Sequence, residues 1–132
     1  MNLAVVGSRS LKDNELAKED AKKLIRGAII ALSTNKIISG GANGPDTWAE
    51  EVAKDMGIEV LVFKPDWKTY GKGAGYRRNY DIVKNADHIL IFWDGASKGT
   101  QHDIILTHKQ EKPYELFIFN GQEWRKTCKL PY

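Results

Sequence analysis

The stretch that decides the fold is KIISGGANGPDTWAEEVAKDMG, residues 36–57. It begins as a short apolar strand, passes through a glycine-rich turn, and enters a segment whose apolar residues recur at helical spacing. Pro45 suits the first turn of that helix, because its missing N–H group would be unpaired there anyway. Gly57 is a strong stop signal for its end. A strand that leads through a tight turn into a helix is the repeating unit of an α/β protein.

The same alternation continues along the chain in both directions. We expect strands at residues 3–7, 36–39, 59–63, 88–93 and 114–119, and helices at about 13–32, 45–56, 77–85 and 100–110. Strands that are apolar almost throughout predict a parallel sheet with helices on both faces. With right-handed crossovers, this gives a single Rossmann-like, doubly wound α/β domain with a five-stranded, mainly parallel sheet. We assign this domain to residues 1–120 and treat residues 121–132 as a C-terminal tail.

The composition is that of an ordinary globular domain, and 132 residues are enough to bury a core. The apolar runs are only strand-sized, so we expect no membrane span, and the N-terminus lacks the pattern of a signal peptide. Cys128 is the only cysteine, which suits a cytoplasmic location. The net charge of +3 comes from scattered residues, so nucleic acid is not the favoured partner.

The sequence offers little for a metal or a resident cofactor. Its histidines, His88, His102 and His108, show no metal-ligand spacing with Cys128, so we expect no metal. Neither the P-loop pattern nor the dinucleotide-binding Gly-x-Gly-x-x-Gly pattern is present, and we expect no cofactor.

The first helix carries an apolar face that could pack on the core or on a second copy of the chain. A homo-oligomer is therefore open at this stage. The residues of this face are Leu24, Ile25, Ile29 and Leu32.

Three segments rich in glycine and polar residues follow the first, second and fourth expected strands. In a doubly wound sheet, ligands bind beyond the carboxyl ends of the strands, where the strand order reverses. We therefore expect all three segments to meet at one ligand site. Their candidate ligand-binding residues are Gly7, Ser8 and Arg9; Ser39, Gly40, Gly41, Gly44 and Asp46; and Asp94, Gly95, Ser97, Lys98, Gly99 and Thr100.

The chemistry of these segments favours a phosphorylated ligand. A helix that starts at a glycine turn presents free N–H groups and the positive end of its dipole, which attract an anion. A tight turn that binds nothing explains one such loop equally well. Asp46 would repel phosphate, but it could accept hydrogen bonds from ribose hydroxyls or simply stabilise the helix dipole. In the long loop after the third strand, Trp67 and Tyr70 could stack on a base or pack the loop down.

Several ordered motifs resemble the YspA-type branch of the SLOG superfamily. They are GSRS, SGGANGPD, DWKTYGKGAGYRRN and NADHILIFWDGASKGT, and the resemblance covers roughly residues 3–120. The same superfamily includes the lonely-guy phosphoribohydrolases and the single-strand DNA proteins of the DprA/Smf type. The resemblance implies a Rossmann-like fold that binds a nucleotide-derived ligand, such as an ADP-ribose-like molecule or a nucleoside monophosphate, as sensor, sequestering protein or hydrolase.

The lonely-guy enzymes also suggest catalytic residues. Their arginine before the fourth strand corresponds to Arg78, with Asn79 beside it, and their glutamate after a Gly-Thr pair corresponds to Asp103. The loop here lacks the enzymes' proline and is two residues longer, and Asp103 is one methylene shorter than glutamate. In such a hydrolase Arg78 would grip phosphate while Asp103 stabilised an oxocarbenium-like transition state and activated water. The plainer alternatives are an Arg78 ion pair with Asp81 and a solvent-facing Asp103.

Overall fold

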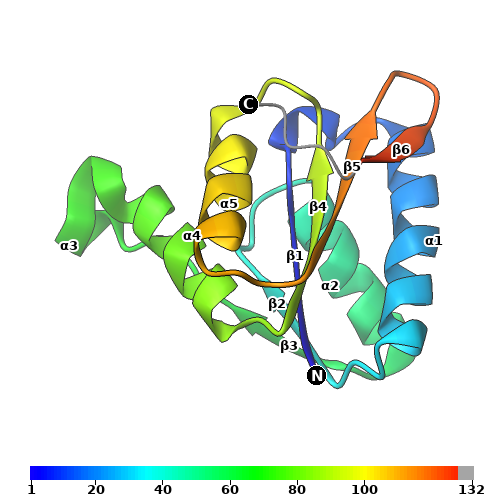
Figure 1. The fold of residues 1–132 in the computed structure, drawn as a ribbon, viewed down its shortest axis with the longest axis horizontal. Helices are drawn as coiled ribbons and strands as arrows, with labels where there is room; N and C mark the ends of the chain where they lie inside the picture. Colours follow the sequence, from blue (N-terminus) through cyan, green and yellow to red (C-terminus); the bar gives the residue numbers. More distant parts are fainter. Residues whose placement is uncertain (128–132) are drawn as a thin grey trace.

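The computed structural model describes residues 1–127 and contains the strand–helix alternation that the sequence predicts (Figure 1). The strands are β1 (Asn2–Gly7), β2 (Lys36–Ser39), β3 (Glu59–Val62), β4 (His88–Trp93), β5 (Tyr114–Phe119) and β6 (Trp124–Thr127). The longer helices are α1 (Glu15–Ala31), α2 (Pro45–Met56), α4 (Ala74–Asn85) and α5 (Lys98–Lys109). Three short helical segments lie between them, η1 (Arg9–Leu11), α3 (Trp67–Tyr70) and η2 (Gly71–Gly73).

The strands form one sheet in the order β3-β2-β1-β4-β5-β6. The first five strands are parallel, and β6 runs antiparallel to β5. The prediction of an α/β, doubly wound fold is confirmed, but the prediction of five strands is wrong because the sheet has six and is mixed. The missed strand follows a turn at Asn120 and Gly121, where Gly121 has a φ of 97° and the Asn120 side chain accepts hydrogen bonds from two backbone N–H groups.

The sheet separates two cores, because successive side chains of a strand point to opposite faces. On β1, Leu3 and Val5 face the layer of α1 and α2, whereas Ala4 and Val6 face the layer of α4 and α5. In α1, Ile25 and Ile29 are buried, and Leu24 and Leu32 pack against the same core. The apolar face of α1 therefore belongs to the core of this chain.

Residue Trp124 explains why β6 forms part of the fold. Its ring packs on Phe92 and Phe119, and its Nε1 donates a hydrogen bond to the backbone carbonyl of Ala17 over 2.9 Å. Residues 124–127 of the expected tail are thus an edge strand that joins the sheet to α1. The rest of that tail, residues 128–132 with Cys128, lies outside the described residues.

The strand order fixes where a ligand site can lie. The chain leaves β1 toward β2 and β3 and later returns through β4 on the other side of β1, so the order reverses between β1 and β4. A crevice opens at the carboxyl ends of two strands with this relation. Within residues 1–127, no helix is both long and apolar enough to cross a lipid bilayer.

Candidate functional site

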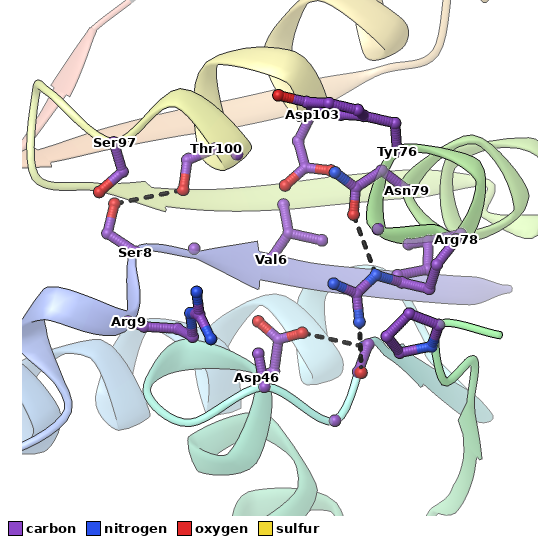
Figure 2. A pocket seen from close by; sticks show the side chains of 18 of the residues that line it. Val6, Ser8, Arg9, Asp46, Tyr76, Arg78, Asn79, Ser97, Thr100 and Asp103 are labelled. Carbon is purple, nitrogen blue, oxygen red and sulfur yellow. Dashed lines mark hydrogen bonds between the residues drawn. The ribbon is translucent and has the colours of Figure 1, made fainter. Parts of the chain in front are cut away.

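A cavity of about 1010 Å³ lies beyond the carboxyl ends of β1, β2 and β4, where the strand order reverses. Figure 2 shows side chains from all three turns, and from α4, pointing into it. The three glycine-containing turns meet at this cavity, as the sequence predicts. Of the residues expected there, those that line the cavity are Gly7, Ser8, Arg9, Gly40, Gly41, Asp46, Trp67, Arg78, Asn79, Ser97, Lys98, Gly99, Thr100 and Asp103.

Four expected ligand residues, Ser39, Gly44, Asp94 and Gly95, do not line this cavity. The Ser39 hydroxyl is buried, donates to Glu50 over 2.8 Å and accepts from the Gly41 N–H, so it shapes the glycine loop. Gly44 precedes α2 with a φ of 103°, which favours glycine. These contacts place the residues behind the cavity wall.

Asp94 organises the loop between β4 and α5. Its carboxylate accepts hydrogen bonds from the N–H groups of Ala96 and Ser97 and, over 2.6 Å, from the hydroxyl of Ser10. These bonds outweigh the effect of partial burial and hold the pKa of Asp94 well below its usual range. Asp94 therefore ties η1 to the loop that carries the cavity residues, instead of pointing at a ligand.

The start of α5 forms the part of the cavity best suited to an anion. The side chain of the N-cap residue Ser97 donates to Asp94 and does not cap the helix, so the first-turn N–H groups remain available to a ligand. The hydroxyls of Ser8 and Thr100 lie 3.2 Å apart beside this helix start. Together with the helix dipole, these groups could bind an anion such as phosphate.

Basic residues outnumber acidic residues on the cavity wall, and the two kinds differ in where they lie. The two acids are both buried, whereas the basic residues come from five different parts of the chain. A ligand with a negative end and uncharged hydroxyls fits this pattern better than a simple anion does. The basic lining residues are Arg9, Lys64, Lys72, Arg78 and Lys98.

Arg78 crosses from α4 to the glycine loop after β2. Its Nη1 donates to the carbonyl of Gly40 over 2.7 Å, and its Nε donates to the Asn79 side-chain oxygen over 3.0 Å. The guanidinium points into the cavity, as Figure 2 shows, and not along α4 toward Asp81. Two fixed hydrogen bonds leave the remaining N–H groups of this planar cation for a ligand.

Two carboxyl groups, those of Asp46 and Asp103, are buried at the cavity floor, each only 5% exposed. Asp46 accepts a hydrogen bond from the Gly40 N–H over 2.9 Å, whereas the Oδ1 atom of Asp103 has no hydrogen-bond partner within residues 1–127. The solvent-facing alternative for Asp103 is wrong, because α5 turns this side chain inward. A buried acceptor without a partner is costly unless a ligand supplies a donor.

Burial dominates the ionisation of both acids. It raises the pKa of Asp46 to about 7, against the hydrogen bond from Gly40 and the charge of Arg78. It raises the pKa of Asp103 well above its usual range, and the negative charge of Asp46 adds to the effect while Arg78 opposes it. Asp46 therefore titrates near neutral pH, where the two acids together carry less negative charge than two free aspartates would.

Replacing Asp46 with asparagine is expected to change how stability depends on pH. Between pH 3.8 and about 7, native Asp46 keeps a proton that the unfolded chain has lost, so the free energy of unfolding falls as pH rises through this window. At pH 8 Asp46→Asn should be more stable than the wild type, by up to about 4 kcal/mol, and at pH 4 the two should agree. Urea denaturation at pH 4, 6 and 8 measures this; equal slopes for both proteins would contradict it.

The cavity also contains residues that the sequence reasoning missed. Tyr76 and Lys72 line its mouth, and the Tyr76 ring lies 4.4 Å from the ring of His102 on α5. Helix α4 begins at residue 74, three residues before the expected start, which explains the omission. Spacing counted from residue 75 would have placed Gly75, Arg78, Asn79 and Ile82 on one helix face.

The two aromatic residues expected to stack on a base differ in position. Trp67 lines the cavity and is 60% exposed, whereas Tyr70 lies beneath the guanidinium of Arg77, 4.5 Å from ring centre to cation. We call α3 and η2 the arm. In Figure 1 α3 projects away from the sheet, and neither α3 nor η2 buries a side chain. Trp67 and Tyr76 are therefore the aromatic residues placed for a ligand.

Comparison with known proteins shows a resemblance in sequence over part of the chain. No known family profile matches the chain. It is 39% identical over 72 residues to the Gene 61 protein of Mycobacterium phage D29. The match covers 50% of this chain and 58% of the phage protein, so the chain spans little more than half the length of that relative.

Solved structures resemble the whole domain. DNA processing protein A from Helicobacter pylori, whose single-stranded DNA binding mode has been described, matches with a TM-score of 0.71 at 20% identity, over 94% of this chain and 68% of that one. The molybdenum cofactor carrier protein of Chlamydomonas reinhardtii matches with a TM-score of 0.66 at 19% identity, over 87% of this chain and 74% of that one. At this identity the likeness concerns the fold, and the chain therefore has the Rossmann-like α/β fold of the DNA processing protein and of the cofactor carrier.

Proposed function

We propose that this chain is a SLOG-type protein of the YspA-type branch that binds a nucleotide-derived ligand in the cavity. The observation that carries the proposal is the meeting of three turns and Arg78 around one cavity that also holds two buried acids. Its volume of about 1010 Å³ lies at the upper end of the range usual for small-molecule sites, which suits a ligand with several parts.

The polar groups suggest how such a ligand lies. Phosphate fits the start of α5, between the Ser8 and Thr100 hydroxyls and the charges of Arg9 and Lys98. Ribose hydroxyls fit the floor, because Asp46 and Asp103 offer acceptors where a second phosphate would be repelled. A planar base then reaches the mouth.

At the mouth, Trp67 and Tyr76 offer ring faces, and the nearby Lys64 and Lys72 suit further negative charge. An ADP-ribose-like molecule uses all these regions, and a nucleoside monophosphate uses most of them. Arg78 lines the same cavity from α4, and we assign its free N–H groups to the phosphate as a further contact.

A binding panel tests the proposal. We expect isothermal titration calorimetry to detect ADP-ribose and AMP, with much weaker signals for adenosine, which lacks phosphate, and for inorganic phosphate, which lacks ribose. Mass spectrometry of small molecules released from the purified, heat-denatured protein identifies the natural ligand. Binding of phosphate as tight as that of AMP would reduce the site to a plain anion site and overturn the proposal.

A second candidate function is hydrolysis of the N-glycosidic bond of a nucleoside monophosphate. Asp103 favours it, because its carboxyl group lines the cavity and, when ionised, could activate water. Water would add to the anomeric carbon of the ribose, the base would leave with a proton, and ribose phosphate would remain. Positive charge developing on the sugar would favour the ionised form of Asp103.

Base release decides between binding and hydrolysis. Incubation with AMP followed by chromatography should show free adenine if the chain is a hydrolase. Asp103→Asn should then lose that release and still bind AMP. If the wild type releases no base from any common nucleoside monophosphate, the hydrolase candidate is excluded while the binding proposal stands.

Single-stranded nucleic acid is a third candidate, and the exposed aromatic side chains near the arm favour it. Trp67, Tyr70, Tyr76 and Tyr80 are each at least 45% exposed, and basic residues lie among them. Aromatic faces with cations between them are typical of surfaces on which bases stack. Filter binding of an oligonucleotide at 50 and 200 mM salt should show a steep loss of affinity if this candidate is correct.

A further inference from the structure

We propose that His102, in its neutral form, is a positioning residue that holds Arg78 in its cavity-facing orientation through the side chain of Asn79. The proposal rests on the proposed function, since it concerns the cation that would bind the ligand's phosphate. It assigns a role to a histidine that points at Asn79 and not at the ligand.

The first step is the orientation of the Asn79 amide. Arg78 Nε can only donate, and the Asn79 side-chain atom 3.0 Å away accepts from it, so this atom must be the oxygen. The amide nitrogen of Asn79 then faces Nδ1 of His102 at 3.3 Å. Asn79 is only 8% exposed, so water has little access to replace either bond.

The second step is the state of the imidazole. The Asn79 amide nitrogen is a donor, so His102 Nδ1 must accept, which requires the neutral tautomer with its proton on Nε2. Protonated His102 would present an N–H group to another N–H group. Rotating the amide by 180° would repair this contact but would turn the Asn79 nitrogen toward Arg78 Nε. Only one arrangement satisfies all three side chains.

The surroundings of His102 favour the neutral form. The Tyr76 ring on α4 packs edge-on at 4.4 Å, and the positive charge of Lys109 lies on the same helix. Arg78 adds a further positive charge beyond Asn79. Partial burial first, and Lys109 second, lower the pKa of His102 below its usual 6.5. We call the hydrogen bonds that join His102 through Asn79 to Arg78 the relay. The relay is therefore intact at neutral pH and is lost as acid protonates the imidazole.

Two substitutions of His102 distinguish a role in positioning Arg78 from a role in packing alone. His102→Asn puts a side-chain oxygen the same number of bonds from the backbone as Nδ1, so it keeps an acceptor that cannot titrate. His102→Phe keeps a ring against Tyr76 but removes the acceptor. His108→Gln on the exposed side of α5 is the matched control.

Nuclear magnetic resonance of the ligand-free protein tests the relay without reference to function. We expect the imidazole ¹⁵N shifts of His102 to report the Nε2–H tautomer at pH 7.5. The Arg78 Nε–H signal should show a shift that follows His102 protonation below pH 6.5, and this component should be absent in His102→Asn, where only the titration of Asp46 near pH 7 remains. An Nδ1–H tautomer at pH 7.5, or an Arg78 Nε–H signal that does not change when His102 becomes protonated, would overturn the proposal.

Calorimetry with AMP as the probe adds the functional measurement. At pH 7.5 His102→Phe should bind AMP roughly fivefold to tenfold more weakly than the wild type, because Asn79 is no longer fixed as the acceptor for Arg78, and the two affinities should converge as acid protonates His102. His102→Asn and His108→Gln should match the wild type at pH 7.5. Below pH 6.5 the wild type should weaken relative to His102→Asn; Asp46 and the AMP phosphate titrate in both proteins, so this ratio isolates His102.

The outcomes remain distinguishable. Failure of AMP to bind any of these proteins would count against the proposed function, while the relay would still be decided by the ligand-free spectra. Normal AMP affinity in His102→Phe would show that Arg78 does not depend on His102, and would overturn the inference even if AMP binds.

Discussion

Replacing Arg78 with alanine is expected to weaken the binding of AMP and ADP-ribose about 100-fold, because a partly buried cation that pairs with phosphate is worth several kcal/mol. The guanidinium is fixed by the Gly40 carbonyl and by Asn79 before any ligand arrives, so little ordering is needed on binding. The substitution also removes the positive charge that lowers the pKa of both Asp46 and Asp103. Calorimetry at pH 7.5 measures the loss.

The chain supplies a matched control for this prediction in the preceding residue. Arg77 carries the same charge on the same helix, but it stacks on Tyr70 and does not line the cavity. Arg77→Ala should therefore bind AMP within about twofold of the wild type, if the pocket and not the net charge holds the ligand. Arg78→Lys should fall between, since lysine keeps the charge without the planar donor array. Equal losses in Arg77→Ala and Arg78→Ala would refute the assignment.

Replacing Gly7 with alanine should produce the largest loss of stability. A Cβ atom at Gly7 would collide with the backbone carbonyl of Phe92 and would come within 2.5 Å of Pro45 Cγ. Gly7 pairs with Phe92 across β1 and β4, and Pro45 begins α2, so three elements meet where this side chain is absent. Neither β4 nor α2 can move away from the added Cβ atom without breaking the strand pairing or shifting the cavity wall. We expect the free energy of unfolding to fall by about 3 kcal/mol or more.

Gly27→Ala is the control for Gly7→Ala. Gly27 lies inside α1, and nothing is within 4 Å of a Cβ placed there. Alanine at this position should raise the free energy of unfolding by about 1 kcal/mol, because glycine is a poor helix residue. Urea denaturation followed by circular dichroism measures both variants. A Gly7→Ala protein as stable as the wild type would mean that β1, β4 and α2 can separate at little cost.

The fold was largely predictable from the sequence because its signals are local and repeated. Buried parallel strands read as continuous apolar runs, and α2 carries both its start and its stop signal, Pro45 and Gly57, in its own sequence. β6 was missed for an equally physical reason. An edge strand needs only one buried side, and its main anchor, Trp124, finds its partners on α1, β4 and β5.

The location of the cavity was predictable from the sequence, but its internal contacts were not. The rule that ligands bind where strand order reverses places Ser8, Gly41 and Thr100 together without any knowledge of side-chain packing. This rule cannot tell whether a polar side chain points into the cavity or instead makes hydrogen bonds that fix the conformation of a loop. Asp94 and Ser39 belong to the second kind, and Asp103 to the first, because the rotation of α5 and the bends of the turns decide the direction.

The arm buries no side chain of its own in α3 or η2, yet Trp67 and Lys72 form part of the cavity mouth. Substitutions there change the cavity lining while leaving both hydrophobic layers untouched. On the proposed function, substitutions in the arm can therefore change ligand preference at little cost in stability.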